Sequence, residues 1–225
     1  MNGAAAGAPS GHRAPIEALI AELGGRAESL WTRLAPRVGR SSARVLFTAV
    51  EPGAGTTLLA CVTAWELAQN LRRRTVLLEA NVHRPAAAAY LGVAPIAGLS
   101  DLLDGRADFA RCVRDVDPGK FLRLVPGGTP RAAIPGELLT PGARNTFAEL
   151  AADTEVLIID APALSEGPQA RLMFDQVDGV VLVLRARRTL KRDLVRASEQ
   201  IEAAGVPLLG AILNRFRPEA RFLAR

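Results

Sequence analysis

The stretch VLFTAVEPGAGTTLLA, residues 45–60, constrains the fold more than any other part of the 225-residue chain. Its first half is a continuous apolar run typical of a buried strand, and its second half begins a helical pattern. Between them, two glycines permit a tight turn in which backbone N–H groups approach an anion at the helix start. This layout predicts a phosphate-binding loop formed by Pro52, Gly53, Ala54, Gly55, Thr56 and Thr57.

The loop departs from the usual pattern at one position. A phosphate-binding loop carries a lysine that reaches the β- and γ-phosphates, followed by a Ser or Thr that binds Mg²⁺. Thr57 occupies the Mg²⁺ position, but Thr56 stands where the lysine is expected. Lys120 and Lys191 are the only lysines of the chain, and neither lies in a motif that points to the loop. Taken alone, the stretch could equally be an ordinary glycine-rich turn.

Apolar strands alternate with helices over the rest of the chain. The predicted strands are 43–50, 75–80, 156–162, 178–186 and 206–216, with a further strand and the turn after it in 121–128. The predicted helices are 57–71, 99–103, 109–113, 145–152 and 190–204. Continuous apolar strands separated by helices are typical of a parallel sheet that is covered on both faces. We therefore expect a doubly wound α/β domain of P-loop NTPase type, whose ligands sit at the carboxyl ends of the strands.

The domain organisation follows from composition. Residues 1–14 are small and rich in Pro and Gly, which predicts a disordered leader. Residues 15–43 have helical apolar spacing followed by a linker, residues 44–218 form the single α/β domain, and residues 219–225 form a short tail without a tyrosine cluster. No apolar run is long enough for a spanning helix, and the N-terminus lacks the pattern of an export signal. These features predict a cytoplasmic protein.

Charge and cysteine content narrow the function further. The net charge is +5, and nearly all basic residues are arginines, which indicates a compositional bias rather than a nucleic-acid surface. The mild basicity suits an anionic membrane face or an acidic partner. Two cysteines, Cys61 and Cys112, form neither a metal cluster nor a disulfide framework.

Polar residues follow two further strands. Asp160 ends the strand VLIID. This is the position of a carboxylate that holds Mg²⁺ directly or through water in nucleotide-binding proteins. The alternative is an aspartate that caps a helix or forms a turn. Glu79, Asn81, His83 and Arg84 follow the strand TVLL. Because parallel strands end at one edge of the sheet, these groups and the glycine loop are expected at one site.

The ordered motifs EPGAGTT, VLLEANVHRP, GLSDLLDG, LRLVPGGTP, PGELL, VLIIDAP and AILNRF resemble one known family over residues 44–216. They are similar to the cytoplasmic kinase domain of the bacterial tyrosine kinases of capsule and exopolysaccharide synthesis. The resemblance implies that the loop, Arg84 and Asn214 bind ATP or ADP, with Asn214 on the adenine, and that Thr57 and Asp160 hold Mg²⁺. Asp160 and Glu79 are then the remaining catalytic candidates.

The chain departs from the family where charge is needed. The family loop ends PGEGK[ST] and its second-strand motif is DADLRRP, whereas this chain has Thr56, Asn81 and His83 at three of those charged positions. The family also carries a tail of several tyrosines, while this sequence has one tyrosine, Tyr90. These departures predict weak nucleotide and Mg²⁺ binding with catalysis lost.

The resemblance therefore implies a degenerate kinase, a pseudokinase-like regulatory module at the inner face of the plasma membrane. Its implied partner is the cytoplasmic segment of a membrane polysaccharide co-polymerase. A homo-oligomer is the other implied assembly, and no nucleic-acid partner is expected. Two alternatives remain open: an active ATP-dependent tyrosine autokinase, and a partitioning-type ATPase, against which the GLSDLLDG motif argues.

Overall fold

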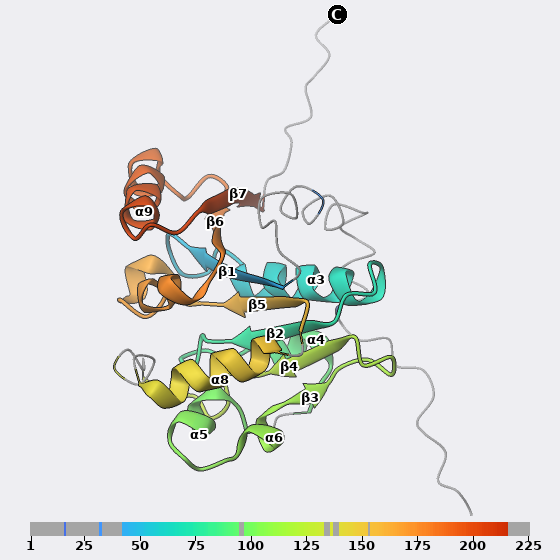
Figure 1. The fold of residues 1–225 in the computed structure, drawn as a ribbon. Helices are drawn as coiled ribbons and strands as arrows, with labels where there is room; N and C mark the ends of the chain where they lie inside the picture. The colour runs from blue at the N-terminus through green and yellow to red at the C-terminus, as the bar shows by residue number, and fades with distance from the viewer. Residues whose placement is uncertain are drawn as a thin grey trace, which may run out of the picture.

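A seven-stranded sheet runs through the centre of the chain in a computed structural model that describes residues 16, 32, 42–94, 97–132, 136, 140–152 and 154–215 (Figure 1). The strands are β1 (Ala43–Ala49), β2 (Thr75–Glu79), β3 (Arg114–Asp115), β4 (Leu122–Val125), β5 (Val156–Asp160), β6 (Gly179–Arg185) and β7 (Leu208–Asn214). The helices are α3 (Thr56–Gln69), α4 (Ala87–Leu91), α5 (Leu99–Leu103), α6 (Phe109–Cys112), α8 (Pro141–Ala152) and α9 (Lys191–Ala203), with short 3₁₀ helices at Leu164–Glu166 and Arg171–Gln176.

The strand order is β3-β4-β2-β5-β1-β6-β7, and every neighbouring pair is parallel except β3 with β4. β1 lies between β5 and β6, so the loop that follows it leaves from the middle of the sheet. The predicted parallel α/β sheet is confirmed. β3 was not predicted from the sequence, because its two residues are too few to show an apolar pattern.

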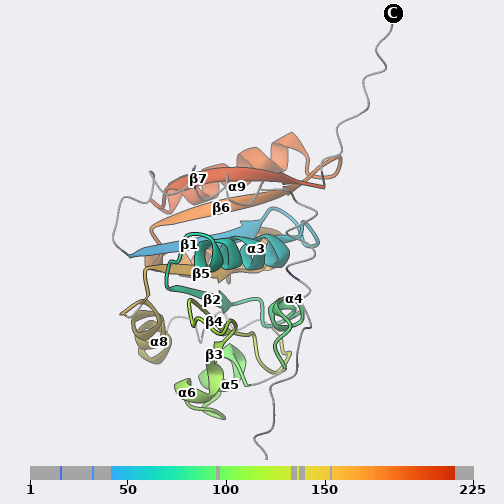
Figure 2. The same ribbon diagram turned by 90° about the vertical axis from the view of Figure 1, so that its right-hand side faces the viewer.

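Helices cover both faces of the sheet (Figure 2). Successive side chains of a strand point to opposite faces, and accordingly Val45 and Phe47 join the core beneath α3 and α4, while Leu46 joins the core beneath α5, α6, α8 and α9. This burial on both faces explains why the strands read as continuous apolar runs. The doubly wound architecture predicted from that pattern is confirmed.

Helix boundaries differ from the predicted ones by a few residues. α3 begins at Thr56, one residue before the predicted start, and α8 begins at Pro141, four residues before the predicted Asn145. Proline is favoured at the first position of a helix because its missing N–H has no partner there in any case. The helical run that follows Pro85 forms α4.

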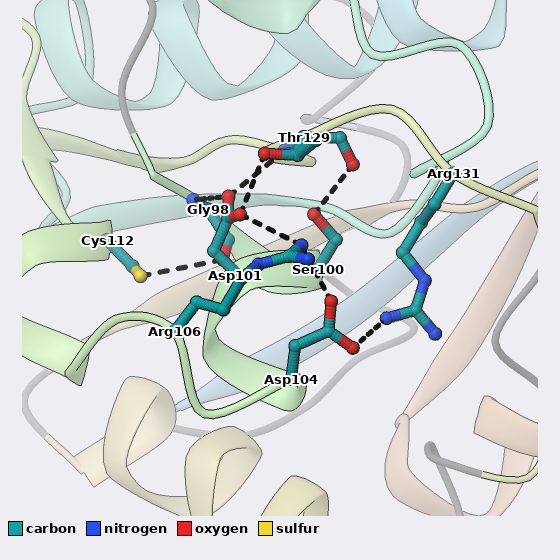
Figure 3. A network of polar contacts seen from close by, with 8 residues as sticks. All are labelled: Gly98, Ser100, Asp101, Asp104, Arg106, Cys112, Thr129 and Arg131. Atoms are coloured by element: carbon teal, nitrogen blue, oxygen red, sulfur yellow. Dashed lines mark hydrogen bonds and ion pairs between the residues drawn. The ribbon is translucent and has the colours of Figure 1, made fainter.

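The GLSDLLDG motif forms α5 and the turn after it (Figure 3). Asp101, on this helix, accepts hydrogen bonds from the backbone of Gly98 and from both the N–H and the hydroxyl of Thr129, and it pairs with Arg106. The motif therefore ties the loop that follows β4 to α5.

Several predicted segments lie outside the described residues: the leader 1–14, most of the helical segment 15–43, most of the PGELL motif and the tail 219–225. Within the second of these, Ile16 and Thr32 are each in a helix, and the Ile16 side chain is fully buried in the core on the α3 side. In the described ranges, no helix has the length and apolar character to span a membrane.

Candidate nucleotide-binding site

The loop between β1 and α3 has the backbone of a phosphate-binding turn. Gly53 and Gly55 have φ angles of 78° and 93°, a region that residues with a Cβ rarely adopt. A Cβ at Gly55 would lie 2.3 Å from the side-chain nitrogen of Asn214, so glycine is also required there by packing. α3 begins directly after this glycine, at Thr56.

Asn214, at the end of β7, fastens the loop. Its Nδ2 donates a hydrogen bond of 2.7 Å to the carbonyl oxygen of Ala54, and its Oδ1 accepts one of 2.8 Å from the N–H of Arg215. The structure thus places this predicted adenine ligand in contact with the loop. The side-chain amide holds the tip of the loop against the last strand of the sheet.

A cavity of about 230 Å³ opens over the loop. Of the predicted nucleotide-binding residues, Pro52, Gly53, Gly55, Thr56, Thr57 and Arg84 line it, and Ala54 is buried behind them. The first N–H groups of a helix have no acceptor within the helix, and those of Thr56 and Thr57 donate to no other group among the described residues. The cavity therefore presents backbone donors and the positive end of α3 to an anion.

Asp160, at the end of β5, lies behind Thr57. The Thr57 hydroxyl donates a hydrogen bond of 2.6 Å to Asp160 Oδ2. The other oxygen, Oδ1, is fully buried and has no hydrogen-bond partner among the described residues. Burial raises the pKa of Asp160 well above its usual value, the bond from Thr57 lowers it in part, and the nearby Glu79 raises it further. An unpartnered buried carboxylate oxygen is costly unless a ligand satisfies it.

These two oxygens fit a magnesium ion. Mg²⁺ takes oxygen ligands, keeps several waters and is usually held by one or two protein groups together with substrate phosphates. The Thr57 hydroxyl and the free oxygen of Asp160 would be those protein groups. Among the described residues no group of three or more His, Cys, Asp or Glu could hold a metal by itself. When bound, the ion would neutralise phosphate charge beside the loop.

Glu79 pairs with Asp160 in register across β2 and β5 but serves a different purpose. Its Oε1 accepts from the N–H groups of Ala86 and Ala87, and its Oε2 accepts from that of Gly127. Burial raises the pKa of Glu79, and these three bonds lower it in part. The carboxylate is fully buried and anchors the loops after β2 and β4, outside the set of residues that line the cavity.

The residues after Glu79 lie along the opposite wall. Asn81 and Arg84 line the cavity, and Arg84 forms an ion pair with Glu166. Asn81 and His83 also line an adjoining cavity of about 270 Å³. This placement agrees with the prediction that polar groups from the ends of β1, β2 and β5 meet at one edge of the sheet.

Among the polar residues that line the cavity, four were not assigned to the site from the sequence: Glu51, Tyr90, Glu166 and Arg215. Arg215 directly follows Asn214, so the LNRF motif contained a signal for it. Both lysines of the chain are described, and neither lines the cavity. Lys120 pairs with Asp115 beside the β3–β4 turn, and Lys191 is the first residue of α9.

Comparison with known proteins gives a consistent result. No protein-family model matches the chain. It is 27% identical over 179 residues to the tyrosine-protein kinase CpsD of Streptococcus agalactiae, covering 79% of this chain and 77% of that protein. The kinase domain of VpsO superposes with a TM-score of 0.79 at 24% identity, covering 89% of this chain and 98% of that one.

A more distant fold neighbour is the septum site-determining protein MinD of Pyrococcus horikoshii, which was solved with Mg-ADP. It superposes with a TM-score of 0.60 at 20% identity, over 78% of this chain and 71% of that one. In sequence the chain is thus similar to bacterial tyrosine-protein kinases, and its α/β fold is shared with the kinase domain of VpsO and with MinD.

Proposed function

We propose that the chain is a kinase-like regulatory module that binds ATP or ADP with Mg²⁺ weakly and has lost efficient phosphoryl transfer. One observation carries this proposal: the position of the phosphate-binding lysine is held by Thr56, and no lysine lines the cavity. The loop, the start of α3 and the Thr57–Asp160 pair remain in place, which supports residual binding.

The loss of the lysine bears on transfer more than on binding. Phosphoryl transfer depends on positioning and on neutralising the charge that spreads over the γ-phosphoryl oxygens. Removing one preorganised donor from such a site costs about 3–4 kcal/mol, on the order of 10²–10³ in rate. Binding of the ground state draws on many contacts, among them the backbone donors of the loop.

The resemblance to capsule and exopolysaccharide kinases suggests the setting of this module. We propose that it works at the inner face of the plasma membrane with the cytoplasmic segment of a polysaccharide co-polymerase, alone or as a homo-oligomer. Co-purification of the chain with that segment, and its loss from the membrane fraction when the co-polymerase is deleted, would support this assignment. A chain that stays cytosolic and unbound in both tests would contradict it.

The transfer assay separates the proposal from its main alternative. The purified chain is incubated with Mg²⁺ and ATP labelled on the γ-phosphate, beside an Asp160→Ala variant. We expect no phosphotyrosine in either sample. Tyrosine labelling of the wild-type chain that disappears in Asp160→Ala would overturn the loss of transfer.

One observation favours the alternative of an active autokinase. Tyr90, the single tyrosine of the sequence, lines the same cavity as the loop. If transfer does occur, Tyr90 is the acceptor within reach of the nucleotide, and Tyr90→Phe would abolish the label. A wild-type chain that shows no label in this assay would exclude the alternative.

A further inference from the structure

We propose that Arg185 and Arg215 bind the nucleotide phosphates in place of the lysine that Thr56 replaces. The inference deepens the proposed function, because it rests on nucleotide binding at the same cavity. It assigns the cationic charge of the site to two strand ends, those of β6 and β7, rather than to the loop itself.

Arg185 ends β6 beside the loop. One guanidinium nitrogen of Arg185 lies 3.8 Å from the position that a Cβ on Gly53 would take, so this side chain reaches over the phosphate-binding turn. Its backbone N–H donates to the hydroxyl of Thr189, and the same hydroxyl donates to Glu51 at the start of the turn, both at 2.8 Å. The end of β6 is therefore fixed to the loop.

Arg215 approaches from the end of β7 and lines the cavity together with Gly53 and Thr56. Its φ angle of 57° lies in the left-handed region, which costs a residue with a side chain about 1 kcal/mol or more. The bond from its N–H to Asn214 Oδ1 holds this conformation, and Asn214 in turn holds Ala54. A strained backbone that aims a cation into a cavity points to a function at that cavity.

Arg185 and Arg215 differ from Arg84, the third arginine at the site, in what their guanidinium groups contact. Arg84 is occupied by its ion pair with Glu166. The guanidinium groups of Arg185 and Arg215 form no hydrogen bond or ion pair within the part of the chain that the structure describes. They are thus available to an anion, and phosphate is the anion that a guanidinium fork binds in a bidentate manner.

This arrangement accounts for a loop without a lysine. A lysine at residue 56 would reach the phosphates from the start of α3, whereas the arginines reach them from the neighbouring strands. Arginine matches phosphate oxygens well but does not reproduce the geometry of the loop lysine. The pair therefore supports binding of a nucleoside diphosphate or triphosphate while leaving transfer impaired.

The test is the affinity of the whole chain for ADP with Mg²⁺, measured by titration calorimetry at fixed ionic strength. We expect Arg185→Gln and Arg215→Gln each to weaken binding by about tenfold or more, since a hydrogen bond to a charged group is worth that much. Adenosine, which has no phosphate, should bind equally to all variants. Arg215→Lys should recover part of the affinity, because it keeps the charge.

Arg196→Gln is the matched control, since Arg196 is an exposed arginine on α9 outside the cavity lining. It removes the same charge and should leave ADP affinity unchanged. Equal affinity of wild type, Arg185→Gln and Arg215→Gln would overturn the inference, and so would a wild-type chain that binds no ADP. Both results leave the proposed loss of transfer standing, because that is decided by the labelling assay.

A double-mutant cycle with Thr56→Lys gives a second readout. If the arginines bind the phosphates in place of the lysine, Thr56→Lys should increase ADP affinity more in the Arg185→Gln background than in wild type. Equal gains in both backgrounds would show that the two positions act independently and would contradict the substitution.

Discussion

At the scale of single residues, Asp160 carries a charge that the protein alone does not satisfy. Its pKa is raised by burial, so the folded state binds the proton more tightly than the unfolded state does. The stability that this group contributes is therefore lost as pH rises from the unfolded pKa of about 3.9 through the higher folded value. Magnesium at the free oxygen would reverse this effect.

Asp160→Asn removes the charge at nearly constant shape. We expect the variant to exceed wild type in free energy of unfolding by about 1 kcal/mol or more at pH 8, with the difference shrinking toward pH 4. Urea unfolding in a chelating buffer at several pH values measures this. Identical pH dependence of the two proteins would contradict the assignment of the unsatisfied charge to Asp160.

The residues of the site differ in how far the sequence could predict them. Thr57 and Asp160 follow from motifs, because a strand end and a helix start fix where their side chains lie. Arg185 and Arg215 could not be assigned from the sequence. The approach of Arg185 to Gly53 depends on contacts between distant segments, and the position of Arg215 depends on a left-handed backbone. Glu79 was a catalytic candidate by position, yet three backbone donors occupy its carboxylate.

At the scale of elements, α5 is held by the buried carboxylate at its centre (Figure 3). Burial acts to raise the pKa of Asp101, but bonds from Thr129, Gly98 and Arg106 outweigh it and hold the pKa below its usual value. Asp101→Asn would place an amide against N–H donors. We therefore expect the free energy of unfolding to fall by about 1–3 kcal/mol at neutral pH, and this difference from wild type to shrink as pH falls. Thermal unfolding measures the loss.

Asp104→Asn provides the control for this prediction. Asp104 also pairs with Arg106, and with Arg131, but at the protein surface, where such pairs contribute about 0–1 kcal/mol. If the two substitutions lowered the melting temperature equally, the buried network would not be what fixes α5.

Elements were predictable in proportion to their apolar content. The buried parallel strands and α3 show long apolar patterns, whereas β3 and the 3₁₀ helices are short and depend on neighbours that the local sequence does not reveal. α8 begins earlier than predicted because Pro141 is favoured in the first turn of a helix, whereas the apolar pattern around it is weak.

At the scale of the whole molecule, the site joins segments from across the sheet. The loop after β1 contacts β5 through the Thr57–Asp160 bond and β7 through Asn214, and Glu51 connects it to the turn after β6. The sequence could predict that these strand ends share one edge, because a doubly wound sheet places them there. A ligand bound at this edge should therefore stabilise the fold as a unit.

ADP with Mg²⁺ should raise the melting temperature of the whole chain in a concentration-dependent way. A ligand at one hundred times its dissociation constant stabilises the native state by about 2.7 kcal/mol, which corresponds to roughly 5–10 °C for a domain of this size. Differential scanning fluorimetry over a range of ADP concentrations measures the shift, with adenosine plus Mg²⁺ as the control that lacks phosphate. Asp160→Asn should reduce the Mg²⁺-dependent part of the shift while leaving the part from the loop, because the magnesium ligand and the backbone donors are separate groups. A melting temperature that does not respond to ADP at any concentration would show that the cavity does not bind nucleotide, and the module would then act through its surfaces alone.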